Sequence, residues 1–229
     1  MNKIITQASL VIGLLAFSTA YAETNSKYAL TAKIGTLGVG ADLTYGMTDK
    51  LNARFSVNGG SISADGEEDG INYKGDLDLL SGGALVDYHP FISNFRLSAG
   101  LFANENEFNL DASGSNNAVI GARSYDLSNA NLNTQIGFNS LAPYLGIGWG
   151  NAVKKGSQWR FSLDAGVLFQ GSPEAKFTTS GTVDSGAGAI SVNDSLFQND
   201  LDQEEQNLND ELKDFKALPV ISLGTSYRF

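Results

Sequence analysis

The strongest constraint in this sequence is an alternation of apolar and polar residues that repeats along most of the chain. In residues 28–35 the even positions are apolar and the odd positions are small or polar, and in residues 51–58 the odd positions are apolar. A period of two is that of a β-strand with one apolar and one polar face. Eight such segments follow one another, at residues 28–35, 39–46, 51–58, 80–88, 95–101, 141–149, 159–169 and 221–229. The chain is therefore expected to be all-β.

One segment breaks this pattern. Leu77 and Leu79 are out of phase with the apolar positions that follow them, Leu80, Ala84 and Val86. An extra residue in one strand shifts its two faces in this way, so the pattern predicts a β-bulge near Leu79.

The polar face distinguishes a soluble β-sandwich from a barrel in lipid. A sandwich exposes a polar face rich in Lys and Glu, whereas here that face holds mainly Gly, Ser and Asn with isolated charges. Only 17% of the residues are charged, against about a quarter in an ordinary soluble domain. Aromatic residues also gather at segment ends, as in the girdles of membrane barrels. These features predict an eight-stranded antiparallel transmembrane β-barrel, with apolar side chains toward lipid and polar ones toward the lumen.

The first 22 residues are expected to be a cleaved signal peptide, which leaves residues 23–229 as the barrel. Lys3 gives a positive start, residues 10–17 are apolar, and Ala20-Tyr21-Ala22 has the small-x-small pattern of a cleavage site. The chain has no Cys, which excludes a disulfide framework, and its formal charge of -10 argues against a nucleic-acid partner. Together with the barrel pattern, the signal peptide predicts a location in the outer membrane of a Gram-negative bacterium.

The links between the segments alternate in length, which orients the barrel. Periplasmic turns are short and external loops are long. The short links are at residues 47–50, 89–94 and 153–157, and the long ones at 59–74, 104–139 and 171–218, with the tight turn at 35–38 as an exception. With an even number of strands, both termini are then expected in the periplasm.

The last long link contains a possible helix. Residues 200–213 lack Gly and Pro and place Leu201, Leu208 and Leu212 on one helical face. Asn199 or Asp200 is a suitable N-cap. The pattern predicts a short amphipathic helix in this external loop, with a solvated acidic stretch as the alternative.

Eight charged residues fall on the polar face and are expected inside the barrel. They are Lys33, Asp42, Arg54, Asp87, Arg96, Arg160, Asp164 and Arg228. An unpaired charge in a narrow interior is costly, so these residues are expected to pair. Eight strands leave an interior just wide enough for side chains to fill. Two interpretations stay open: a salt-bridge network that plugs the barrel, or a polar path that guides small zwitterions.

No catalytic, cofactor-binding or metal-binding set is predicted. The sole histidine, His89, precedes Pro90 in a short link and is interpreted as a turn residue. A near match to the spacing of a calcium loop is formed by Asp65, Glu67, Asp69, Gly70 and Asp76. Its last position is Asp where the motif has Glu, and no helices flank it, so an acidic, solvated loop is favoured.

Several short stretches carry a resemblance to known proteins. Residues 43–55 (LTYGMTDKLNARF) look like a hairpin of small OmpA-, OmpX- and OmpW-like barrels, and the terminal Tyr227 and Phe229 resemble the signal that the barrel-assembly machinery reads. The layout more specifically resembles the CarO family of ornithine-uptake porins. The stretches that carry this are residues 33–36 (KIGT), 73–78 (YKGDLD), 142–148 (APYLGIG) and 171–176 (GSPEAK), with the acidic helix and the last strand after Leu218-Pro219. The resemblance implies an eight-stranded barrel and uptake of small basic amino acids, although the loops differ from the family in length and sequence.

These observations predict a narrow, selective channel for small basic or zwitterionic solutes, without cofactor or enzymatic activity. The alternative is a non-conducting structural or interaction barrel with acidic surface loops. The expected partners are outer membrane lipid, lipopolysaccharide and the barrel-assembly machinery, and the protein is expected to be a monomer.

Overall fold

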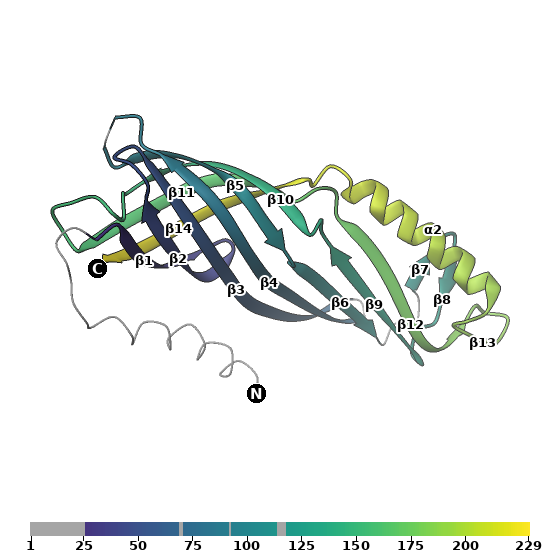
Figure 1. Cartoon of the computed structure of the whole chain (residues 1–229). Coiled ribbons are helices and arrows are strands. Elements are labelled where there is room, and N and C mark those ends of the chain that lie inside the picture. Colours follow the sequence, from purple (N-terminus) through teal and green to yellow (C-terminus); the bar gives the residue numbers. More distant parts are fainter. Residues whose placement is uncertain (1–25, 69–70, 92, 114–117) are drawn as a thin grey trace.

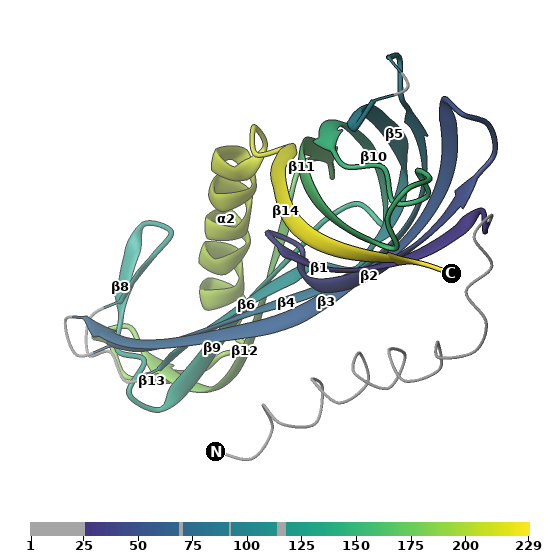
Figure 2. The same cartoon turned by 90° about the vertical axis from the view of Figure 1, so that its left-hand side faces the viewer.

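The structure is a computed structural model and describes residues 26–68, 71–91, 93–113 and 118–229. The predicted signal peptide lies outside the described residues. Eight strands form a closed antiparallel ring, in which β5 hydrogen-bonds to both β4 and β10 and β1 hydrogen-bonds to β14 (Figure 2). They are β1 (Tyr28–Gly35), β2 (Gly38–Gly46), β3 (Leu51–Glu68), β4 (Ile71–Tyr88), β5 (Phe95–Asn104), β10 (Leu141–Trp149), β11 (Trp159–Phe169) and β14 (Ala217–Arg228). These strands contain seven of the eight segments predicted from the alternation, and β14 contains the eighth (residues 221–229) except for its last residue, Phe229.

The three long links were predicted to be loops, with a helix only in the last, whereas the structure has strands in all three. β3 and β4 continue past the ring as a hairpin of two 18-residue strands, and the other two links add strands beside it (Figure 1). The added elements are β6 (Glu107–Ser113), β7 (Ala118–Ile120), β8 (Arg123–Tyr125), β9 (Ala130–Gly137), β12 (Glu174–Asp184), β13 (Ala189–Ser191) and the helix α2 (Ser195–Leu212). We call the described parts of residues 60–79, 105–140 and 170–216 the platform. It projects from the end of the ring opposite the C-terminus (Figure 1).

The phase break in β4 has a different cause from the predicted bulge. β3 and β4 pair one to one from Leu51↔Tyr88 to Glu68↔Ile71, so there is no extra residue near Leu79. Instead, the apolar side chains change face. Leu80 and Val86 are exposed on the outside of the ring, whereas Leu77 and Leu79 lie on the face that continues the lumen side.

The outside of the platform is polar where the outside of the ring is apolar. Above Leu80 that face carries Asp78, which accepts a hydrogen bond from Ser61 Oγ at 2.6 Å, and Asp76, which accepts one from Ser63. The ring portions of β3 and β4 (residues 51–59 and 80–88) have the length of about 9–11 residues that a tilted strand needs to cross a bilayer. The change of face therefore marks the point at which these strands leave the apolar layer.

α2 covers one edge of the platform sheet. Asn209 Oδ1 accepts from Ala175 N at 2.7 Å, Asn209 Nδ2 donates to Ala175 O at 3.2 Å, and Glu205 Oε2 accepts from Phe177 N at 3.0 Å. These contacts satisfy backbone groups of β12 that have no strand partner on that side. Within the described chain, no helix has the length and apolar character needed to cross a membrane.

The helix predicted in the last long link is confirmed, but its predicted start was wrong. α2 begins at Ser195, and Asp194 is its N-cap, accepting from Leu196 N at 2.9 Å. The earlier start lets the first turns of the helix enter a small apolar core under the β7–β8 hairpin. This core consists of Ile120, Tyr125, Leu127, Ala130, Val183, Val192, Phe197 and Leu201.

Candidate functional site: a filled lumen below an acidic platform

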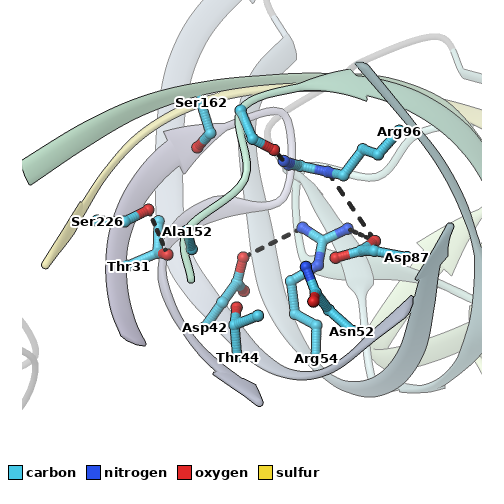
Figure 3. Close-up of a pocket in the computed structure, with 11 residues that line it drawn as sticks. Thr31, Asp42, Thr44, Asn52, Arg54, Asp87, Arg96, Ala152, Ser162 and Ser226 are labelled. Carbon is cyan, nitrogen blue, oxygen red and sulfur yellow. Dashed lines mark hydrogen bonds and ion pairs between the residues drawn. The ribbon is translucent and has the colours of Figure 1, made fainter. Parts of the chain in front are cut away.

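Arg54 lies at the centre of the lumen, between carboxylates from three other strands. Its Nη2 lies 2.9 Å from Asp87 Oδ1, and its Nη1 lies 3.3 Å from Asp42 Oδ2 and 3.6 Å from Asp164 Oδ2. Lys33 Nζ completes the pairing of Asp42, at 2.7 Å from Oδ1. Figure 3 shows Arg54 with Asp42 on one side and Asp87 on the other. A single guanidinium thus holds several strands of the ring together across its interior.

Arg96 forms the second half of this network. Its Nη2 lies 2.7 Å from both carboxylate oxygens of Asp164, and its Nε lies 3.9 Å from Asp87 Oδ1. Its Nη1 donates to the carbonyl of Gly150. The neighbouring Gly148 leaves room for this arrangement, because a Cβ there would lie 2.8 Å from Arg96 Nε and from Asp164 Oδ1.

The network leaves almost no free space. It joins three acids to three bases, Lys33, Arg54 and Arg96, so its formal charge is balanced. The cavity beside it has a volume of about 10 Å³ and is lined by residues that include Thr31, Thr44 and Ser226. A single buried water needs roughly 10–15 Å³. The described side chains therefore fill the lumen at this level.

An apolar cluster closes the lumen a second time, toward the platform. Its members are Leu37, Leu85, Phe102, Ala142, Tyr144, Leu168 and Val220. The rings of Phe102 and Tyr144 meet edge to face, with centroids 5.8 Å apart. Leu37 comes from the tight β1–β2 turn, the exception among the external links. Its side chain is buried, so this short turn helps to cap the barrel interior.

The opposite mouth is narrowed by the turn between β10 and β11 (residues 150–158). Gly150 accepts from Arg96, Asn151 Oδ1 accepts from Asn52 Nδ2 at 3.3 Å, and Ala152 lines the small cavity (Figure 3). The turn is therefore folded into the mouth and tied to the charged network.

His89 helps to close the same mouth. It directly follows β4, and its side chain is fully buried. Nδ1 lies 3.1 Å from Phe95 O, and Nε2 lies 3.1 Å from Asn52 Nδ2. A carbonyl can only accept and an amide nitrogen can only donate, so the ring is neutral with its proton on Nδ1. Burial lowers the pKa of His89 below its ordinary value of 6.5.

Two of the eight predicted lumen charges lie outside the network. Arg160 donates from Nε and Nη2 to the carbonyl of Lys154, at 3.2 and 3.1 Å, and from Nη2 to that of Lys155 at 3.0 Å. Arg228 is buried, and no carboxylate of the described residues lies within ion-pair distance of it. Both residues belong to the end of the ring that carries the C-terminus.

The two residues of the predicted assembly signal form an aromatic cluster at that end. Tyr227 meets Trp159 at a centroid distance of 5.0 Å and Phe229 at 5.8 Å, both edge to face. Trp159 is 63% exposed on the outside of the ring. Such a cluster suits the interfacial girdle of a membrane barrel.

In the platform, the buried carboxylate of Asp200 pairs with Arg123, whose side chain is half exposed. Asp200 Oδ1 lies 2.7 Å from Arg123 Nη1, and Asp200 Oδ2 accepts from Tyr125 OH at 2.7 Å. These hydrogen bonds hold the pKa of the Asp200 carboxyl below its ordinary value of 3.8. Asp200, one of the two predicted N-cap candidates, is not the N-cap of α2; its side chain instead holds α2 against the β7–β8 hairpin.

The calcium-loop spacing does not produce a loop. Asp65 and Asp76 lie on the paired strands β3 and β4, where Asp76 contacts Ser63 and Lys74. Asp69 and Gly70 lie outside the described residues. Among the residues that the structure describes, no group of three or more His, Asp or Glu is arranged to hold a metal ion.

Comparison with known proteins agrees with this architecture. CarO from Acinetobacter baumannii has a similar structure, with a TM-score of 0.58 and 20% sequence identity over 91% of this chain and 100% of that one. The chain has a CarO-like outer membrane barrel fold. CarO2 of the same species matches with a TM-score of 0.58 and 20% identity over 88% of this chain and 98% of that one. A major outer membrane protein of Thermus thermophilus shows a weaker likeness, with a TM-score of 0.41 and 15% identity over 88% of this chain and 99% of that one. No family model and no curated protein matches the chain.

The apolar cluster of the lumen was missed by the sequence analysis. The sequence did contain a sign of this cluster. Four large apolar or aromatic residues stand at the inward-facing positions, which are otherwise polar or small: Leu85, Phe102, Tyr144 and Leu168. Large apolar residues in that phase fill the interior of this CarO-like barrel.

Proposed function

We propose that this protein is an outer membrane barrel with a closed lumen, and that its function is to display the platform as an interaction surface outside the cell. The closed lumen is the observation that carries this proposal. Arg54 and Arg96 fill one level of the barrel beside a cavity of about 10 Å³, and the apolar cluster around Phe102 and Tyr144 fills the next.

The size and charge of the platform support a role in binding. Residues 60–68 of β3 alone extend the strand by roughly 30 Å. The whole of residues 60–79, 105–140 and 170–216 contains 20 acidic and 5 basic residues. Such a concentration of negative charge attracts cationic partners and repels anionic ones.

The orientation follows from the same layout. In membrane barrels the long connections lie outside the cell and the short turns lie in the periplasm. The acidic platform is therefore placed outside the cell and the short turns at the other end in the periplasm. Both termini are then periplasmic, and the acidic platform borders lipopolysaccharide, whose divalent cations its carboxylates can share. The aromatic C-terminus formed by Tyr227 and Phe229 is the element that the barrel-assembly machinery would engage. We propose no enzymatic activity, since both ring nitrogens of His89 are engaged in structural hydrogen bonds.

A second candidate function is a narrow path for small basic or zwitterionic solutes. The favouring observation is that the small cavity is lined by polar groups, including Asp42, Asp87 and the hydroxyls of Thr31 and Ser226. An ammonium group could be passed between these oxygens. Such passage requires Arg54, Arg96 and the apolar cluster to move, so it would be a gated channel whose closed state is the one described.

Single-cysteine labelling tests the display function, because the chain contains no Cys. Asp210→Cys on the outer face of α2 and Lys155→Cys in the β10–β11 turn are both exposed positions. A polyethylene-glycol maleimide too large for porins should label Asp210→Cys on intact cells and Lys155→Cys only after the outer membrane is permeabilised. The opposite pattern, or recovery of the protein in the soluble periplasmic fraction, contradicts the proposal.

A further inference from the structure

One long edge of the platform sheet is open. β2 pairs with β3 only as far as Val39↔Gly59, whereas β4 pairs with β3 as far as Glu68↔Ile71. In the described part of the chain, residues 60–68 of β3 therefore have a strand partner on one side only, and β3 forms the border of the projecting sheet (Figure 1). On the other side, alternate residues present free backbone N–H and C=O groups.

The opposite edge of the same sheet, formed by β12, is covered by other elements. There, Asn209 and Glu205 of α2 hydrogen-bond to the backbone of Ala175 and Phe177, and β13 pairs with the end of β12. Natural proteins usually protect a free edge with Lys, Pro, a bulge or a covering element. Residues 60–64 (GSISA) have none of these, the acids of this edge begin only at Asp65, and residues 61–66 are all exposed.

The two faces next to the open edge differ in chemistry. On the outer face, Ser61 and Ser63 stand beside Asp78 and Asp76, and Asp65 follows in the same phase. On the other face, Ile62 is 62% exposed and is followed by Ala64. An added strand would place alternate side chains beside Ser61, Ser63 and Asp65 on one face and beside Ile62 on the other. Asp76 and Asp78 then lie one strand further in, about 10 Å away, which is within reach of a long basic side chain.

We propose that the open edge of β3 binds an extended peptide segment in which basic and apolar residues alternate. The free backbone groups supply the affinity of strand addition, and the alternation of acids and Ile62 sets the sequence preference. A second copy of this chain is a poorer occupant, because pairing two such edges would bring two acidic surfaces together. The inference rests on the proposed display function and names its class of partner.

The test measures binding of a capped nine-residue peptide of alternating Lys and Val to the detergent-solubilised full chain by fluorescence anisotropy. The same peptide with N-methyl groups on alternate amides keeps its charge but loses donors on one edge. We expect it to bind at least about tenfold more weakly, as does a peptide in which Glu replaces Lys. Equal binding of the methylated and unmethylated peptides overturns strand addition.

Two variants with the same change in net charge locate the site. Asp76→Asn/Asp78→Asn should weaken binding of the Lys–Val peptide severalfold, whereas Asp202→Asn/Glu211→Gln, on exposed positions of α2, should leave it unchanged. Equal losses in both variants overturn the site, as does a concentration-dependent dimer that the peptide cannot dissociate. If no peptide binds while Asp210→Cys is still labelled on intact cells, the strand-addition proposal fails and the display function stands.

Discussion

The Arg54 guanidinium lies 2.9 Å from the Asp87 carboxylate inside the barrel, with the two residues on neighbouring strands and 33 positions apart. The side chains of both are less than a tenth exposed, and the same arginine reaches Asp42 and Asp164. This ion pair connects two strands of the barrel wall and belongs to the group of charged side chains that fills the lumen. Stability and closure of the lumen therefore depend on the same residues.

Removing Arg54 should destabilise the folded barrel strongly. Arg54→Met leaves Asp42, Asp87 and Asp164 with too little positive charge, and loss of one partner from a buried ion pair costs about 3–5 kcal/mol. The measurement is the free energy of unfolding in urea for protein refolded into detergent. Lys176→Met is the matched control, since its contact with Glu174 is exposed and should contribute less than about 1 kcal/mol. Equal losses in the two variants would contradict the role of the network.

The stability of the mouth that contains His89 should fall as the solution is acidified below pH 6.5. Burial lowers the pKa of His89, so the unfolded chain takes up a proton before the folded one does. The stabilisation is complete above the unfolded pKa of about 6.5 and is lost progressively as pH falls toward the folded pKa. Protonation of His89 would also make Nε2 a hydrogen-bond donor that faces another donor, the side-chain amide nitrogen of Asn52. Unfolding midpoints measured between pH 7.5 and 5 should decline for the natural chain and decline less for His89→Gln; parallel curves would show that another group is responsible.

Loss of Asn209 should release α2 from the edge of β12. Asn209→Ala leaves the buried N–H and C=O of Ala175 without partners, which costs about 1–3 kcal/mol. Hydrogen exchange of α2 amides should then accelerate by roughly 5- to 150-fold if the helix opens as a unit. Asn207→Ala, at an exposed position of the same helix, should exchange at the natural rate. Unchanged exchange in Asn209→Ala would mean that other contacts hold the helix.

A charge at the last residue should impair assembly. Phe229 packs edge to face on Tyr227, and Phe229→Asp would place a carboxylate in the aromatic cluster at the membrane interface. We expect a lower yield of the folded form that shifts on gels when heated, with normal removal of the predicted signal peptide. Phe215→Asp is the control, because Phe215 is 66% exposed in the link before β14. A normal yield of folded Phe229→Asp would count against the terminal signal.

The ring could be predicted from the sequence because lipid imposes one rule on every strand that crosses it. Phe55, Val57, Leu145 and Ile147 are all exposed on the outside of the ring, and polar or small residues alternate with them. The rule ends with the apolar layer. At Leu79 and Leu80 the apolar side chains change from one face of β4 to the other. In the sequence this change looks like an inserted residue. In the structure it marks the border of the membrane-spanning part of the strand.

The platform and the lumen were harder to predict, for two physical reasons. In the platform, strands such as β9 carry Asn and Gln beside Leu132 and Ile136, so their composition resembles that of a loop. In the lumen, alternation indicates which side chains point inward but not which of them meet. Arg54 and Arg96 find carboxylates, whereas Arg160 ends on the carbonyls of the β10–β11 turn. That turn folds into the mouth, and its position depends on contacts that no local pattern encodes.

Flux through the purified natural chain in liposomes tests the closed lumen most directly. Uptake of ornithine, arginine and glutamate is measured in parallel, with an open general porin in matched liposomes as the positive control. The filled lumen predicts background rates for all three solutes at low and high salt. Entry of ornithine and arginine well above glutamate, with a preference that weakens as salt screens the acidic platform, would contradict it and establish a selective channel.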